Sequence, residues 1–68
     1  MWTDTPESSN IKRWKYEGTT LTVEFKYGAQ YEYEDVPARV IDVMAKAEST
    51  GKYFNSRIKQ AGYKFKKL

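Results

Sequence analysis

Cysteine and histidine are both absent from this chain of 68 residues. Their absence excludes disulfide bonds, thiolate nucleophiles, Cys/His zinc sites and the imidazole that usually moves protons at neutral pH. A chain this short buries only about 60% of the surface that it exposes when unfolded, so we expect one domain with one small core. We also expect packing alone to stabilise it, with no metal and no cofactor.

Long hydrophobic runs are absent as well. No stretch approaches the roughly 20 apolar residues that cross a bilayer, and the N-terminus does not read as a signal peptide. We therefore expect no membrane association, a cytoplasmic location and a monomer.

Catalytic motifs are also missing. No serine has a general base in a motif around it. The acidic residues Glu32, Glu34 and Asp35 cluster at a strand end, which a solvated edge explains more simply than a pair of catalytic carboxylates. Each of the four glycines has a turn or cap explanation, so there is no phosphate-binding loop. We expect a protein that is not an enzyme.

Three runs of alternating residues predict an antiparallel sheet. A two-residue loop at Gly18-Thr19 and a three-residue loop at Lys26–Gly28 place all the apolar residues on one face, whereas a slip of one residue would reverse every side chain. This register gives five pairs: Tyr16 with Leu21, Trp14 with Val23, Phe25 with Ala29, Val23 with Tyr31, and Leu21 with Tyr33. Ile11 is out of phase, which predicts a β-bulge near Lys12-Arg13.

The period changes to a helical one after Pro37, which suits the first turn of a helix. The expected buried residues of the first helix are Val36, Val40, Val43, Met44 and Ala47, and those of the second are Phe54, Ile58 and Ala61. Between the helices, either Gly51 ends the first or Ser49 caps the second.

The predicted fold class is α+β, a three-stranded antiparallel sheet with two helices packed on one face (βββαα). Residues 1–7 are expected to be a flexible leader, residues 8–63 the domain and residues 64–68 a basic C-terminal tail.

The central tyrosines, Tyr31 and Tyr33, invite comparison with sheets that stack RNA bases on exposed aromatic rings. The predicted register instead places them under the helices. Three carboxylates on the open face, Glu24, Glu32 and Glu34, would repel phosphates. We therefore expect both tyrosines to be core residues.

Positive charge is concentrated in the second half of the chain. Six basic residues and no acidic ones follow position 51. Aromatic residues alternate with these lysines, a pattern that suits single-stranded nucleic acid because ammonium groups bind phosphates and rings stack on bases. The candidate nucleic-acid-binding residues are Lys52, Tyr53, Arg57, Lys59, Tyr63, Lys64, Lys66 and Lys67.

Two other interpretations stay open at this point. The basic helix and tail could be only a solvated surface, with Tyr63 and Phe65 folded back onto the core. The partner could also be another protein, bound at an exposed sheet edge or on the acidic face.

The pattern as a whole resembles the KTSC domain over residues 8–63. The matching residues are Ser9, Ile11, Tyr16, Leu21, Val23, Phe25, Gly28, Tyr31, Tyr33, Val36, Pro37, Ala47, Ser49, Gly51, Phe54, Ile58 and Lys59. The resemblance implies a small module found at the C-terminus of some lysyl-tRNA synthetases and alone in bacterial and phage proteins, with a suggested RNA-binding role. It implies no catalytic residues.

Overall fold

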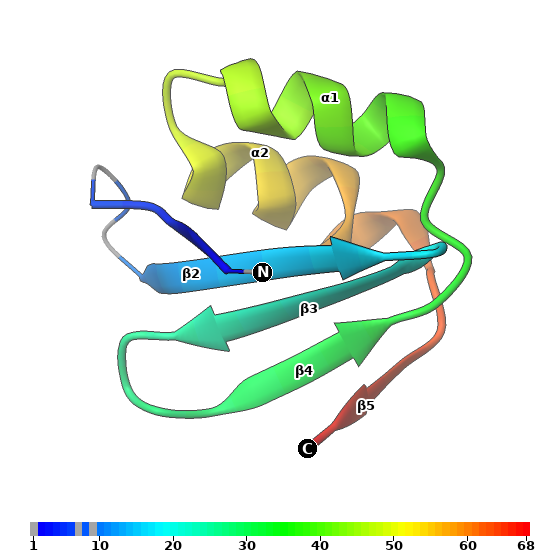
Figure 1. Ribbon diagram of the computed structural model, residues 1–68, viewed down its shortest axis with the longest axis horizontal. Coiled ribbons are helices and arrows are strands. Elements are labelled where there is room, and N and C mark those ends of the chain that lie inside the picture. Colours follow the sequence, from blue (N-terminus) through cyan, green and yellow to red (C-terminus); the bar gives the residue numbers. More distant parts are fainter. Residues whose placement is uncertain (1, 7, 9) are drawn as a thin grey trace.

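The computed structural model describes residues 2–6, 8 and 10–68; Met1, Glu7 and Ser9, which belongs to the KTSC pattern, lie outside the described residues. A five-stranded antiparallel sheet carries two helices on one face (Figure 1). The elements are β1 (Thr3–Asp4), β2 (Ile11–Glu17), β3 (Thr20–Phe25), β4 (Gln30–Tyr33), α1 (Ala38–Lys46), α2 (Thr50–Arg57), the 3-10 helix η1 (Lys59–Ala61) and β5 (Phe65–Lys67). The α+β class is confirmed. The prediction of three strands is wrong, because two short edge strands extend the sheet to five.

The predicted register of the three central strands is confirmed. Leu21 of β3 pairs with Tyr16 of β2 on one side and with Tyr33 of β4 on the other. The loop glycines Gly18 and Gly28 have φ angles of 61° and 103°, a region where a Cβ would clash. Both turns therefore depend on glycine, as the loop lengths predict.

The predicted bulge is also present. The pairing of β2 with β3 shifts between Ile11 and Arg13, so Ile11 returns to the face of the core. Ile11 is 1% exposed as a result.

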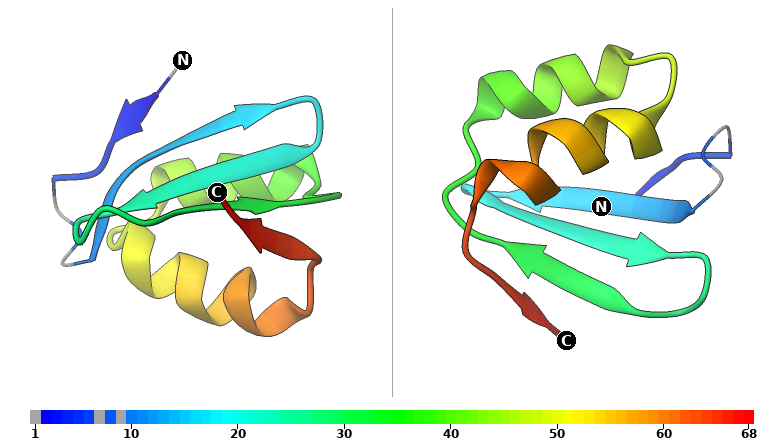
Figure 2. Two further views of the ribbon diagram at one scale, coloured as in Figure 1. Left: turned by 90° about the horizontal axis from the view of Figure 1, so that it is seen from below. Right: turned by 180° about the vertical axis from the view of Figure 1, so that it is seen from behind.

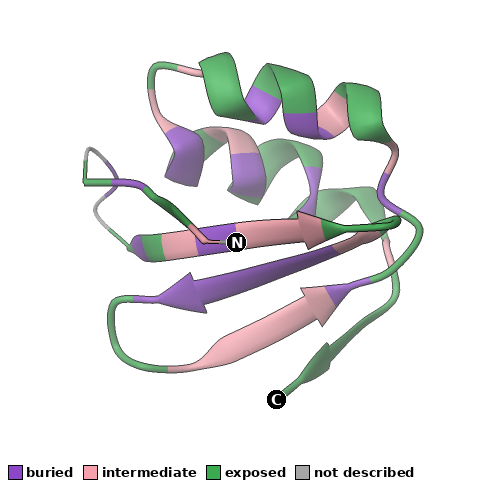
Figure 3. Cartoon of the chain, in the orientation of Figure 1, coloured by how far each residue is buried: buried purple, intermediate pink, exposed green. Residues whose placement is uncertain are grey.

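The core lies between the sheet and the helices (Figure 3). Tyr33 is buried, and Tyr31 is half-buried and packs against the core, so the prediction that both face the helices is confirmed. The buried apolar residues are Ile11, Trp14, Leu21, Val23, Phe25, Tyr33, Val36, Ile41, Met44, Phe54 and Ile58.

The predicted apolar faces of the helices are partly wrong. Val43 is 52% exposed, and Ile41, which the prediction omitted, is buried instead. The buried stripe of α1 runs along Ile41 and Met44, and at about 100° per residue Val43 lies about 130° from the centre of this stripe, on the solvent side of the helix. Ala61 is exposed because α2 ends at Arg57, and the tighter turn of η1 carries Ala61 away from the core.

Ser49, rather than Gly51, marks the boundary between the helices. The Ser49 hydroxyl accepts a hydrogen bond from the Lys52 amide at 3.4 Å, as an N-cap does. Gly51 lies inside α2, where a Cβ would come within 2.5 Å of Asn10 Oδ1 and 2.7 Å of Ser8 Oγ. The glycine therefore permits the close approach of α2 to the loop before β2.

The segment expected to be a flexible leader contains strand β1. Thr3 pairs with Trp14 of β2, and the ring of Trp2 lies 4.3 Å from the Arg13 guanidinium and 5.0 Å from the Lys15 ammonium. The strand pairing holds the described part of the leader at the edge of the sheet, beside β2, and the cation–π contacts hold the Trp2 ring over Arg13 and Lys15.

The segment expected to be a basic tail likewise contains strand β5. Beyond η1 the chain passes the edge of the sheet and pairs with β4 (Figure 2). The Glu34 amide donates a hydrogen bond to the Lys64 carbonyl, and the Leu68 amide donates one to the Gln30 carbonyl, each at 2.8 Å. The basic residues of this segment therefore have fixed directions relative to the sheet.

Candidate functional site

The predicted site residues lie on α2, η1 and β5 and on the turn that joins η1 to β5. All six basic residues are exposed: Lys52, Arg57, Lys59, Lys64, Lys66 and Lys67. Tyr53 and Tyr63 are half-buried and pack against the core. Their rings stabilise the helical layer and are only partly available to a ligand.

Strand β5 divides its side chains between the two faces of the sheet. Phe65 pairs with Tyr33, and Lys67 with Tyr31, so these two residues share the face that carries the helices. Lys66 pairs with Glu32 on the open face, and its ammonium lies 3.6 Å from the Glu32 carboxylate. The structure therefore groups Lys67 with Phe65 and separates Lys66 from them.

Two aromatic rings outside the predicted set, Tyr27 and Phe65, are exposed to solvent. Tyr27 is 73% exposed and Phe65 is 58% exposed. Tyr27 stacks on buried Phe25, with ring centroids 5.5 Å apart and 13° between the planes. Phe65 stacks on buried Tyr33, at 5.2 Å and 27°. Each exposed ring therefore has a core ring behind it.

Sequence reasoning missed Tyr27 because it lies in a turn. Phe65 is part of the predicted alternation of aromatic residues and lysines in the tail, but it is not among the candidate residues, and the other interpretation folds its ring back onto the core. A signal for Phe65 was present: Phe65 and Lys67 alternate with Lys66, which is the pattern of a strand with two different faces.

A hollow of about 190 Å³ opens between these rings and the 3-10 helix, and we call it the aromatic hollow. Its lining residues are Phe25, Tyr27, Tyr31, Tyr33, Lys59 and Phe65. Lys59 is the one charged residue among them, so the hollow combines aromatic walls with a single positive group.

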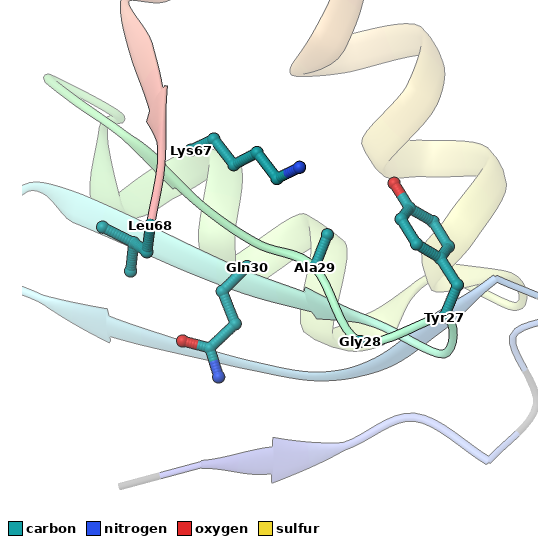
Figure 4. Close-up of a pocket in the computed structure, with 6 residues that line it drawn as sticks. All are labelled: Tyr27, Gly28, Ala29, Gln30, Lys67 and Leu68. Atoms are coloured by element: carbon teal, nitrogen blue, oxygen red, sulfur yellow. The ribbon is translucent and has the colours of Figure 1, made fainter.

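A shallower hollow of about 430 Å³ adjoins it and shares Tyr27. Its other lining residues are Gly28, Ala29, Gln30, Lys67 and Leu68. Tyr27 and Lys67 extend on one side of β4, with their polar ends toward each other, while Gln30 and Leu68 point to the other side (Figure 4). Lys59 and Lys67 thus flank the exposed aromatic rings from two different elements.

The phenol of Tyr33 stays neutral at physiological pH. Burial raises the pKa of Tyr33 above its usual value of 10.0, and the neighbouring Tyr31 and Tyr27 raise the pKa further. Tyr33 therefore contributes no negative charge that would offset the lysines.

The open face is less acidic than the sequence suggested. Glu24 pairs with Arg13, and Glu32 pairs with Lys66. The hydrogen bond from Arg13 has the largest effect on the pKa of Glu24 and lowers it; desolvation opposes this, and the charges of Arg13 and Lys12 lower the pKa further. Of the three carboxylates expected to repel phosphates from this face, Glu24 and Glu32 therefore each have a neighbouring cation, from β2 and β5 respectively.

Within residues 2–6, 8 and 10–68, no three His, Cys, Asp or Glu side chains come close enough to hold a metal ion. Over the same residues, no helix has the length and apolar character needed to cross a membrane.

Comparison with known proteins identifies relatives of two kinds. The chain is similar to the lysine–tRNA ligases of Trichormus variabilis and Nostoc punctiforme, with 45% identity over 65 residues in each case. The match covers 93% of this chain but only 11% of each ligase. An uncharacterized protein of Stutzerimonas stutzeri is 38% identical over 61 residues, which cover 87% of this chain and 86% of that protein.

The fold and the sequence pattern point to the same family. The crystal structure of a KTSC domain protein from Yersinia pestis matches with a TM-score of 0.87 and 25% identity, covering 100% of this chain and 96% of the other. The sequence model of the KTSC domain matches residues 7–63. Since that match takes in most of the sheet and both helices, the chain belongs to the KTSC domain family.

Proposed function

We propose that this protein is a small, non-enzymatic module that binds single-stranded RNA weakly, through the surface formed by α2, η1 and β5. The observation that carries the proposal is the placement of Lys59 and Lys67 on either side of two exposed aromatic rings, Tyr27 and Phe65. Single-strand binders combine these two kinds of group, since ammonium groups attract phosphates and rings accept bases.

The charge around this surface supports the same function. No acidic residue occurs from Lys52 to the C-terminus, and no acidic side chain lines either hollow. A phosphate backbone therefore meets no like charge on β5 or η1, whereas most of the acidic residues belong to the first half of the chain.

The relatives are consistent with an RNA ligand. The ligases that share this domain are named for an activity on tRNA, so in those proteins the domain belongs to a chain that handles RNA. A related domain that carries a basic surface is therefore a candidate for an RNA contact here.

The test is a titration of a labelled single-stranded RNA at two salt concentrations. Three to six phosphate contacts on a single strand predict a slope of about −2 to −4 for the logarithm of the association constant against the logarithm of salt concentration. Replacing Arg57, Lys59 and Lys64 with glutamate should abolish binding at low salt.

The matched control reverses three exposed basic residues elsewhere: Lys12 on β2, and Arg39 and Lys46 on α1. Both variants have the same net charge, so a specific surface predicts that only the first loses binding. Equal loss in the two variants would show that overall charge, and not this surface, attracts the RNA.

One observation favours a second function, the binding of a partner protein: the backbone of β5 is exposed at the edge of the sheet. Because the Glu34 amide bonds to the Lys64 carbonyl and the Leu68 amide bonds to the Gln30 carbonyl, the backbone groups of Phe65 and Lys67 point away from β4. A partner protein could add a strand there. Such a partner would bind with little dependence on salt, and the protein would then show no affinity for RNA at low salt.

A further inference from the structure

The two exposed rings stand out because the other aromatic side chains are buried or half-buried. Of the eleven aromatic residues, only Tyr27 and Phe65 are exposed, and they line the same hollow. They come from different elements, the β3–β4 turn and β5. Exposed apolar side chains gathered at one place usually mark a binding site.

The rings are also held in place before any ligand arrives. Phe25 supports Tyr27 and Tyr33 supports Phe65, through the stacked contacts described above. Tyr31 lies between the two stacks, with its ring 5.7 Å from Phe25 and 6.0 Å from Phe65. A ligand that stacks here loses little affinity to ordering of the protein, since the rings are already packed.

The size of the aromatic hollow restricts the ligand. Pockets for drug-sized molecules measure about 300–1,000 Å³. The aromatic hollow, at about 190 Å³, has room for a single planar ring system.

The charges select among planar groups. Lys59 lies in the wall of the aromatic hollow and Lys67 in the wall of the adjoining one. In a nucleic-acid strand every base has a phosphate on either side, so one bound base brings two anions close to these two lysines. An aromatic side chain of a peptide has no such pair of charges.

We propose that the aromatic hollow is a subsite for one nucleobase of a single-stranded nucleic acid, with the flanking phosphates near Lys59 and Lys67. The proposal rests on the proposed function and adds to it that bases, and not only phosphates, determine affinity. Stacking on an aromatic side chain predicts a contribution of roughly 5- to 150-fold per base.

The experiment compares two labelled probes of equal length and charge, a ten-residue oligouridylate and a ten-residue abasic ribose-phosphate oligomer, at one low salt concentration. We expect the parent protein to bind the oligouridylate roughly 5- to 150-fold more tightly than the abasic oligomer. Phe65→Leu and Tyr27→Leu, which remove a ring and keep an apolar side chain, should bring this ratio close to one while leaving the affinity for the abasic oligomer unchanged. Val43→Ala, at an exposed apolar residue of α1, is the control and should keep the parent ratio.

The outcomes separate the two proposals. If the parent binds both probes equally well, the base subsite is wrong and the RNA-binding surface stands. If it binds neither probe at low salt, both proposals are wrong. A parent preference for the oligouridylate that survives in both ring variants would also overturn the subsite, because the base must then stack elsewhere. Circular dichroism spectra that match the parent establish that each variant is folded.

Discussion

At the scale of single residues, Glu24 is a carboxylate that the sheet nearly removes from water. Its side chain is 12% exposed, and the Arg13 side chain donates a hydrogen bond to it from the neighbouring strand. The pair explains how an acidic residue is accommodated at the centre of the sheet, since a charge withdrawn from water needs a partner.

This pair predicts a loss of stability in acid. Because Arg13 lowers the pKa of Glu24 below its usual value of 4.5, the folded protein holds this proton less tightly than the unfolded chain does. The contribution to stability is present above pH 4.5 and is lost as the pH falls through the lowered pKa of the folded state. The free energy of unfolding, measured with urea, should therefore decrease less between pH 7 and pH 3 for Glu24→Gln than for the parent.

The matched control for that measurement is Glu48→Gln. Glu48 is exposed, and it takes part in none of the ion pairs between the described residues. Its variant should follow the pH dependence of the parent, and the idea fails if Glu24→Gln follows that same curve.

At the scale of elements, β5 determines what the basic end of the chain can do. Its side chains alternate between the faces, and its backbone alternates between bonds to β4 and groups that point outward. The alternation of the backbone groups can be tested by substitutions within β5 alone.

Proline should be tolerated at Lys67 but not at Lys66. The Lys66 amide points toward β4, so Lys66→Pro removes a bond of the ladder, whereas the Lys67 amide points outward and Lys67→Pro removes none. Hydrogen exchange should show lost protection of the Glu34 and Leu68 amides in Lys66→Pro and near-parent protection in Lys67→Pro. Each variant loses one lysine, so charge does not distinguish them; equal protection in both would contradict the assigned alternation.

The elements that could be predicted from the sequence are those long enough to show a periodic pattern of apolar residues. Strands β2, β3 and β4 follow from the alternation of apolar residues and from loop lengths that permit only one shared face, and even the bulge beside Ile11 follows from parity. Strands β1 and β5 have two and three residues, which are too few to establish a period. They form because the edge strands of the central sheet can hydrogen-bond to them. For the same reason the candidate site could be predicted only in part. The lysines could be listed from charge, but their separation onto two faces of the sheet and the place of Tyr27 among the site residues depend on the pairing of β4 with β5.

At the scale of the whole molecule, one small core stabilises everything else. A domain of this length has a free energy of unfolding of only about 3–10 kcal/mol. Phe54 is 1% exposed and joins the second helix to the sheet, with its ring 5.8 Å from Phe25 and 5.3 Å from Tyr33. Those two residues are the ones that support the exposed rings.

Removing the Phe54 ring should therefore destabilise the whole domain. Phe54→Ala is expected to cost about 3–5 kcal/mol, which is comparable with the total stability. Urea denaturation followed by circular dichroism measures the change, with Val43→Ala as the control at an exposed apolar residue. An unfolding midpoint equal to that of the parent would refute the central position of Phe54.

The alternation along β5 has a consequence for how the proposed base subsite could be lost during evolution. Exchanging the residues at positions 65 and 66 keeps the composition, the net charge and the length of the chain, and it conserves every backbone bond of the ladder. Yet it moves the phenyl ring to the face of Trp2 and Arg13 and puts an ammonium group against Tyr33. Two relatives could therefore look equivalent by charge and by aromatic content while only one of them has the proposed surface for bases, so the order of these residues, and not their number, is the feature to compare across the family.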